Sequence, residues 1–191
     1  MALQQVDSFT VTSNVANVTI GGGSSSSSGV DFAINTDEVY VVTVNNVFFD
    51  SNDDLRLRWT VSGTNDSSSN YHQSLKAKYH DATYGAAGAA GGSSLDFNQT
   101  TGTSANNAVN MVMHLYNFNN ASGFSYCTFE NVNRNTAQSR TGIFSGSGVL
   151  QENQATDGVY FFANAGNNIA SGTFSLFKVK AVGANGTVEL L

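Results

Sequence analysis

The stretch LRLRWTV, residues 55–61, alternates strictly between apolar and polar side chains. Neighbouring side chains on a β-strand point to opposite faces, so this period of two predicts a strand with one buried face. The residues expected on the buried face are Leu55, Leu57, Trp59 and Val61. Because Trp59 shares its phase with three aliphatic residues, we expect it in the core rather than on a sugar-binding surface.

Short segments with comparable patterns recur along the rest of the chain. Helical patterns, with apolar residues three and four apart, are nearly absent, and the turns must rely on Gly, Asn, Asp and Ser because the chain contains no proline. We therefore expect an all-β protein. The spacing of the segments predicts a single antiparallel β-sandwich domain over residues 1–191, with about eight or nine strands.

Three segments bear on how well parts of the chain are ordered and on whether the chain contacts other subunits. EVYVVTVNNVFF (38–49) is apolar on both faces, which predicts a central strand covered on two sides. GGGSSSSSG (21–29) has the composition of a flexible linker. It is either a flexible loop within the domain or a tether that lets residues 1–20 reach a neighbouring subunit as an N-terminal arm. YGAAGAAGGSS (84–94) is low in complexity and is expected to be a mobile excursion.

The segment GTFSLFKVK (172–180) changes its buried face halfway along. Its first two large apolar residues point to one side, whereas Phe177 and Val179 point to the other. A bulge before Phe177 would bring all four into one core, while a straight strand would leave Phe177 and Val179 to contact another subunit. We favour the bulge, because a straight strand turns Lys178 and Lys180 toward the core side.

A basic patch follows if two neighbouring segments pair. LRLRWTV and HQSLKAKYH (72–80) flank a polar loop and are predicted to form a β-hairpin. Half of the eight basic residues would then share one outer sheet face, namely Arg56, Arg58, Lys76 and Lys78. This face is either simply solvated or a docking patch for an acidic partner surface.

No combination of residues in the sequence predicts catalysis, so we expect neither an enzyme nor a cofactor or metal site. The start of a calcium loop at 50–54 lacks the glycine and the glutamate that such a loop needs. Cys127 lies in an apolar strand and is expected to be a packed thiol. The aromatic residues best placed in polar loops to contact a glycan are Tyr71, Tyr84 and Phe118.

Charge and hydropathy exclude several partners. The net charge of −6 and the sequence pI of about 4.7 argue against nucleic acid, whose phosphates are bound by Lys and Arg. The longest apolar runs are far shorter than a membrane helix requires, so no membrane insertion is expected. The opening MALQQVDSF lacks the features of a secretory signal, which predicts synthesis in the cytoplasm of the host cell.

Three stretches carry a family resemblance: the opening MA…VDSFTVTSNVANVTI, the middle DLRLRWTVSGTNDSSSNYHQS and the ending NAGNNIASGTFSLFKVKA. With them the chain resembles small β-sandwich virion structural proteins of tailed bacteriophages, marine ones especially. The resemblance implies a jelly-roll-like fold without catalytic residues. It also implies a non-enzymatic protein on the virion surface, either a capsid decoration or a compact tail appendage, that contacts other virion proteins.

Two further expectations concern partners. The two-faced strand and the N-terminal arm predict a homo-oligomer, which by analogy with phage surfaces is a trimer. The alternative function is a carbohydrate-binding module, a lectin-like tip of a tail fibre that recognises a host-surface glycan through loop aromatics.

Overall fold

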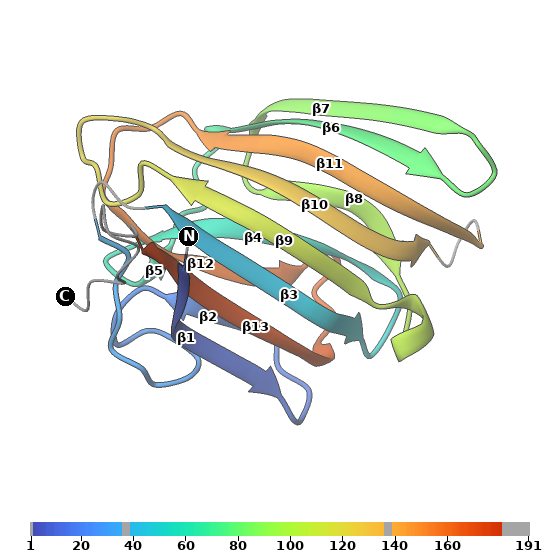
Figure 1. The fold of residues 1–191 in the computed structure, drawn as a ribbon, viewed down its shortest axis with the longest axis horizontal. Helices are drawn as coiled ribbons and strands as arrows, with labels where there is room; N and C mark the ends of the chain where they lie inside the picture. Colours follow the sequence, from blue (N-terminus) through green and yellow to red (C-terminus); the bar gives the residue numbers. More distant parts are fainter. Residues whose placement is uncertain (1, 36–38, 136–138, 181–191) are drawn as a thin grey trace.

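Two antiparallel β-sheets packed face to face make up the protein, as the alternating segments predict (Figure 1). The structure is a computed structural model that describes residues 2–35, 39–135 and 139–180. Within these ranges the one helical element is a 3-10 turn, η1 (Ala105–Asn107). No helix in the described ranges has the length and apolar character needed to cross a membrane.

Thirteen strands are present in the described residues, against the eight or nine expected. The eight-stranded sheet contains, in spatial order, β1 (Ala2–Val11), β13 (Ile169–Lys180), β3 (Tyr40–Phe49), β9 (Val109–Tyr116), β10 (Ser125–Asn135), β11 (Arg140–Leu150), β6 (Tyr71–Tyr79) and β7 (Tyr84–Gly92). The five-stranded sheet contains β2 (Asn17–Gly21), β12 (Thr156–Ala163), β4 (Asp53–Val61) and β5 (Thr64–Asn65), with β8 (Leu95–Thr101) paired to β4. The jelly-roll connectivity implied by the resemblance stays a prediction.

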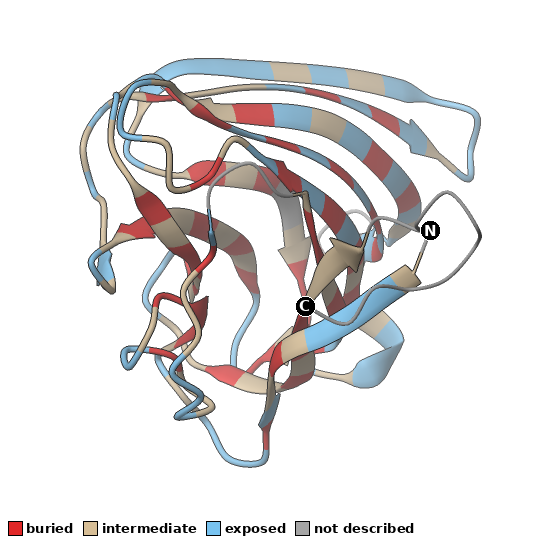
Figure 2. Ribbon diagram, turned by 60° about the vertical axis from the view of Figure 1, so that its left-hand side comes forward, coloured by how far each residue is buried: buried red, intermediate tan, exposed pale blue. Residues whose placement is uncertain are grey.

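The core lies between the two sheets, and buried and exposed residues alternate along many strands (Figure 2). On β4 the expected inward residues Leu55, Leu57 and Trp59 are fully buried, whereas Val61 at the strand end is half-buried. The Trp59 ring contacts the Phe118 ring edge to face, with centroids 4.9 Å apart. Trp59 is therefore a core residue, as its phase predicts.

Strand β3 is central, as expected, but it is not apolar on both faces along its whole length. The register with β9 shifts between Val44 and Val47, and Asn46 within this bulge has a φ of 55°. The bulge reverses the phase, so that residues on both sides of it point into the core. Asn45 and Asn46 are exposed, so this segment does not need a second cover along its whole length.

The bulge expected at Leu176–Phe177 is wrong. Strand β13 pairs with β3 without a break there, since Leu176 lies opposite Val42 and Phe177 opposite Val41. The irregularity lies instead in the partner strand β1, where the register shifts between Gln5 and Asp7. The straight strand therefore carries Phe177 on the face away from the core.

The hairpin expected between β4 and β6 is also wrong, because the two strands belong to different sheets. The polar loop after β4 first folds back as the short strand β5, which pairs with the end of β4. The chain then crosses to the other sheet, where β6 pairs with β11 and β7. The Tyr71 hydroxyl fixes this crossing, since it accepts a hydrogen bond from the Trp59 N–H (2.9 Å) and donates one to the Asp66 carbonyl (3.0 Å).

The alanine- and glycine-rich segment is a strand rather than a loop excursion. As β7 it pairs with β6 and forms one edge of the eight-stranded sheet. All of its side chains are exposed or half-buried, so the pairing depends on the backbone of β6 rather than on burial. A period-two pattern of large apolar residues is therefore missing from the sequence of this strand.

The serine-rich loop after β2 encloses a buried carboxylate. Asp7 of β1 is only 3% exposed and points inward because of the bulge in that strand. One of its oxygens accepts hydrogen bonds from the Gly21 N–H (2.8 Å) and the Ser26 hydroxyl (2.6 Å), and the other accepts one from the Ser28 hydroxyl. Gly21 has a φ of 67°, a left-handed conformation suited to glycine, as the chain turns into this loop. Residues 2–11 meanwhile pair with β13 of the same chain.

Replacing Asp7 should reveal how strongly this carboxylate holds the loop. We expect Asp7→Ala to lower the free energy of unfolding by about 3 kcal/mol, because three buried or half-buried donors lose a charged acceptor. Urea unfolding followed by circular dichroism measures this loss. Asp31→Ala, at an exposed carboxylate of the same loop region, is the matched control, and an equal loss in both variants would contradict the role of Asp7.

Candidate functional site

The expected basic patch is not assembled, because its members lie on two sheets. Arg56 and Arg58 project from β4, whereas Lys76 and Lys78 project from β6 in the other sheet. Arg58 is also engaged within the chain, since its Nε donates to the Ser93 carbonyl (2.9 Å) and its guanidinium lies over the ring of Phe162 (4.6 Å). The prediction of a shared docking face made of these four residues is therefore wrong.

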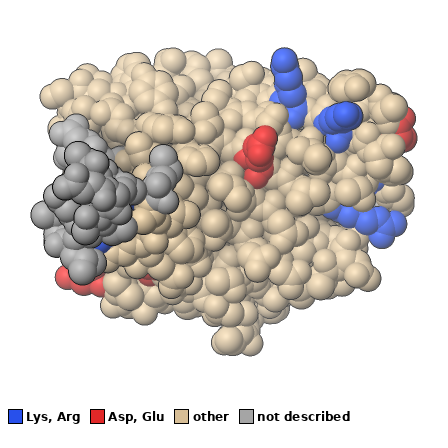
Figure 3. Space-filling model, in the orientation of Figure 1, with Lys and Arg blue, Asp and Glu red and all other residues tan. Residues whose placement is uncertain are grey.

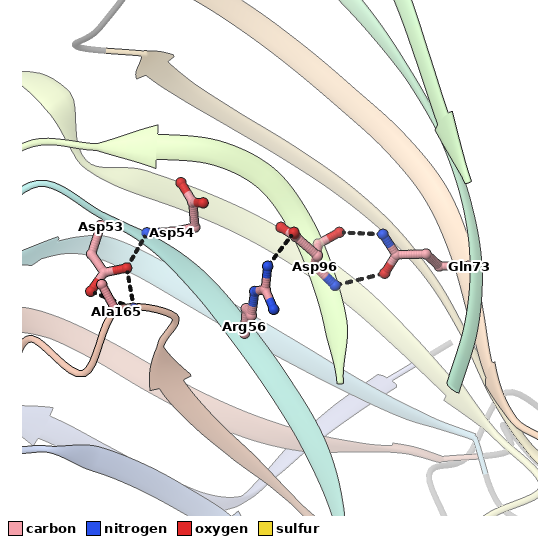
Figure 4. Close-up of polar contacts among 6 residues, drawn as sticks. All are labelled: Asp53, Asp54, Arg56, Gln73, Asp96 and Ala165. Carbon is pink, nitrogen blue, oxygen red and sulfur yellow. Dashed lines mark hydrogen bonds and ion pairs between the residues drawn. The ribbon is translucent and has the colours of Figure 1, made fainter. Parts of the chain in front are cut away.

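Arg56 belongs to a polar link between the two sheets (Figure 4). Its guanidinium forms an ion pair with Asp96 of β8 at 2.9 Å, with both side chains about three-quarters buried. The side-chain amide of Gln73, on β6, donates to the Asp96 carbonyl (3.0 Å) and accepts from the Asp96 N–H (2.6 Å). Gln73 thereby pairs with the edge of β8 as a strand backbone would. We interpret this cluster as structural.

The carboxylates of the sequence DSNDD hold a loop of the protein itself. Asp53 accepts hydrogen bonds from the backbone N–H of Ala165 (2.9 Å) and from the side chain of Asn167 (3.0 Å). Asp50 does the same for Asn168. Within the described ranges no group of three or more His, Cys, Asp or Glu side chains is arranged to hold a metal ion.

Two of the three aromatics expected to contact a glycan are core residues. Tyr71 and Phe118 are fully buried, and burial raises the pKa of the Tyr71 hydroxyl. The polar loops that flank them in sequence made them look exposed. Tyr84 is 75% exposed on β7. Cys127 is a packed thiol, as expected, and burial raises its pKa to about 12.

The outer face of the eight-stranded sheet, the side away from the five-stranded sheet, gathers exposed apolar side chains. Of the eight large hydrophobic residues exposed in the described ranges, only Val30 lies elsewhere. The other seven are Leu3, Tyr84, Val112, Tyr116, Tyr126, Val132 and Ile143. Phe177 and Val179, the expected subunit contacts, are half-buried on the same face, and their contact with another subunit stays a prediction. A monomer seldom gathers its exposed apolar residues on one side unless that side binds something.

Strand pairing arranges this face in rows that run across the strands. One row contains Tyr116, Tyr126, Val149 and His72, which lie opposite one another on β9, β10, β11 and β6. We call these four residues the tyrosine end. Three rows further along the strands, Val132 and Ile143 are paired, with Val112 diagonal to them. We call Val112, Val132 and Ile143 the apolar end.

Three adjoining hollows follow these rows over the outer face. A hollow of about 570 Å³ lies at the apolar end, between β3, β9, β10 and β11. A hollow of about 360 Å³ shares Val112 and Glu130 with it. The third, of about 460 Å³, lies at the tyrosine end and shares Thr128 with the second. Figure 3 shows the same face with few charged side chains. This outer face is the candidate functional site.

Sequence reasoning missed this site although a signal was present. On β9 and β10 alternate residues are buried in the core, and the residues between them point to the outer face. Those outward positions include Val112, Tyr116, Tyr126 and Val132, which are unusually apolar for a solvated face. Their gathering also depends on β11 and β6 lying beside β10, which the pattern of one strand does not indicate.

The chain matches no family model, and no curated protein or solved structure matches it either. The resemblance to virion proteins of tailed phages therefore rests on the three sequence stretches alone.

The raised pKa of Asp54, on β4, predicts how replacing this residue changes stability at different pH values. Burial raises this pKa above its ordinary value of 3.8, so the folded state holds the proton more tightly than the unfolded chain. The resulting stabilisation is present below pH 3.8 and is lost as the pH rises through the folded pKa. We expect Asp54→Asn to be more favourable for stability, relative to the unmodified protein, at pH 7 than at pH 3.

Urea unfolding at both pH values measures this difference. Asp81→Asn is the control of opposite sign, because the side-chain hydrogen bond from Thr83 lowers the pKa of the exposed Asp81 carboxyl. Its cost to stability should therefore be larger at pH 7 than at pH 3. If Asp54→Asn changed the free energy of unfolding by the same amount at both pH values, the raised pKa of Asp54 would be contradicted.

Proposed function

We propose that this chain is a non-enzymatic structural protein on the surface of a tailed-phage particle, a capsid decoration or a compact tail appendage. It acts through contacts with other proteins of the particle, with further copies of itself among them. The observation that carries the proposal is the gathering of seven of eight exposed large hydrophobic residues on the outer face. The resemblance in the three sequence stretches supplies the particle.

The apolar end is the part of this face best suited to a protein partner. Ile143 is 57% exposed and Val132 is 41% exposed, and the two lie directly opposite each other on β11 and β10. They flank the hollow of about 570 Å³, which a side chain from a partner can enter. Burying exposed aliphatic groups of this kind yields roughly 25 cal/mol for each Å² removed from water.

Electron microscopy of phage particles labelled with an antibody against this chain tests the proposal directly. Label on the head or on the tail supports it and decides between decoration and appendage. Particles that contain none of the chain would contradict it, since a structural protein of the surface must be present in finished particles.

Charged substitutions at the apolar end should abolish attachment. In the double variant Val132→Asp with Ile143→Asp, two carboxylates would be desolvated in the contact, so we expect at least about tenfold weaker binding to particles that lack the protein. Copies retained per particle after sedimentation measure the effect. Val30→Asp, at a similarly exposed valine outside the sheet, should bind as the unmodified protein does. Undiminished attachment of a folded double variant would contradict the proposal.

A further inference from the structure

The tyrosine end has the chemistry of a glycan-binding site. We propose that the hollow of about 460 Å³ binds a neutral oligosaccharide, with Tyr116 and Tyr126 as stacking platforms and with hydroxyl groups of the neighbouring row as hydrogen-bonding partners. This site goes beyond the structural role proposed above and does not depend on it, because the residues involved lie outside the apolar end.

The two tyrosines form one aromatic surface. Tyr116 of β9 and Tyr126 of β10 are directly opposite each other, and they are 36% and 45% exposed. The Tyr116 ring lies nearly parallel to the His114 ring, at 17° with centroids 6.4 Å apart, and its hydroxyl is 3.5 Å from the Thr128 hydroxyl. These contacts orient the Tyr116 ring before any ligand arrives. A sugar ring places its C–H face against such a surface and directs its hydroxyls outward.

The next row supplies small polar groups beside the rings. Thr128, Ser147 and Ser74 lie opposite one another on β10, β11 and β6, and all three line the hollow. Their hydroxyls can both donate and accept hydrogen bonds, as the hydroxyls of a sugar can. Because these side chains are short, they rise less far above the sheet than the tyrosine rings do. A ligand lying on this row therefore contacts the aromatic rings from the side.

The lining of the hollow contains no permanently charged side chain, which favours one class of ligand, and His72 is its one basic residue. None of its lining residues is Asp, Glu, Lys or Arg. The nearest charged pair on these strands, Glu130 and Lys76, lies one row further along, on either side of Ser145. A phosphate, a sulfate or a sugar carboxylate would therefore lose its hydration in the hollow with no Lys or Arg side chain to bind it. A neutral glycan incurs no such penalty.

The size of the hollow favours a chain of sugars over a single one. It reaches from Tyr116 on β9 to Ala89 on β7, across five neighbouring strands. Strands lie about 4.8 Å apart, so this distance is roughly 19 Å, which exceeds the length of one sugar ring. The volume of about 460 Å³ is within the range of roughly 300–1,000 Å³ found for small-molecule sites.

A glycan array that contains neutral and acidic oligosaccharides tests the proposal, with calorimetric titration of the strongest neutral binder. We expect neutral oligosaccharides to bind and their sialylated or sulfated counterparts to bind more weakly. Tyr126→Ala should weaken the affinity at least about tenfold, because stacking on an exposed ring is lost, whereas Tyr126→Phe keeps the ring and should lose about threefold or less. Tyr84→Ala, at an exposed tyrosine on the same face but outside the hollow, should change nothing.

The opposite results would overturn the proposal. It fails if no neutral oligosaccharide on the array binds at millimolar concentration, or if binding persists unchanged in folded Tyr116→Ala and Tyr126→Ala variants. Preference for acidic glycans that is removed by substituting Lys76 and Lys78 would move the site to those lysines and equally reject it. Attachment to particles should be retained in Tyr126→Ala, so failure of this site and failure of the proposed structural role are separate outcomes.

Discussion

The packing of the eight-stranded sheet against the five-stranded sheet is the constraint on which the other features depend. Aromatic rings from the two sheets meet across this interface, for example Phe97 with Phe129 at 4.9 Å and Phe161 with Phe174 at 5.0 Å between ring centroids. Each such side chain contributes about 1.5–3 kcal/mol when it leaves water. Once one face of most strands is committed to this interface, the period of two determines which residues remain on the outer faces.

The two outer faces then differ in character. On the five-stranded sheet, Arg58 covers the ring of Phe162 and Arg56 is paired with Asp96, so both guanidinium groups are engaged within the chain. On the eight-stranded sheet, exposed valine, isoleucine and tyrosine side chains surround adjoining hollows. The second face is therefore the one on which we place both proposed sites, the apolar end for a protein surface and the tyrosine end for a neutral glycan.

Sequence patterns predicted which residues point inward better than they predicted which strands lie side by side. Alternation identified Leu55, Leu57 and Trp59 as buried, because the pattern that places them inward can be read from a single strand. It could not show that β4 and β6 belong to different sheets, and the basic patch was wrong for that reason. The phase change near Phe177 was attributed to β13, although the bulge lies in β1, where Asp7 turns inward. Composition likewise concealed β7, whose pairing needs no large side chains.

Hydroxyl-radical footprinting of the protein, free and on phage particles, tests the central claim that the outer face of the eight-stranded sheet is the binding face. The account predicts that oxidation of Val112 and Ile143 falls strongly on the particle, because a partner excludes water from them. Oxidation of Tyr160 and Phe162, on the outer side of the five-stranded sheet, should stay unchanged. Protection of Tyr160 and Phe162 with continued oxidation of Val112 and Ile143 would contradict it.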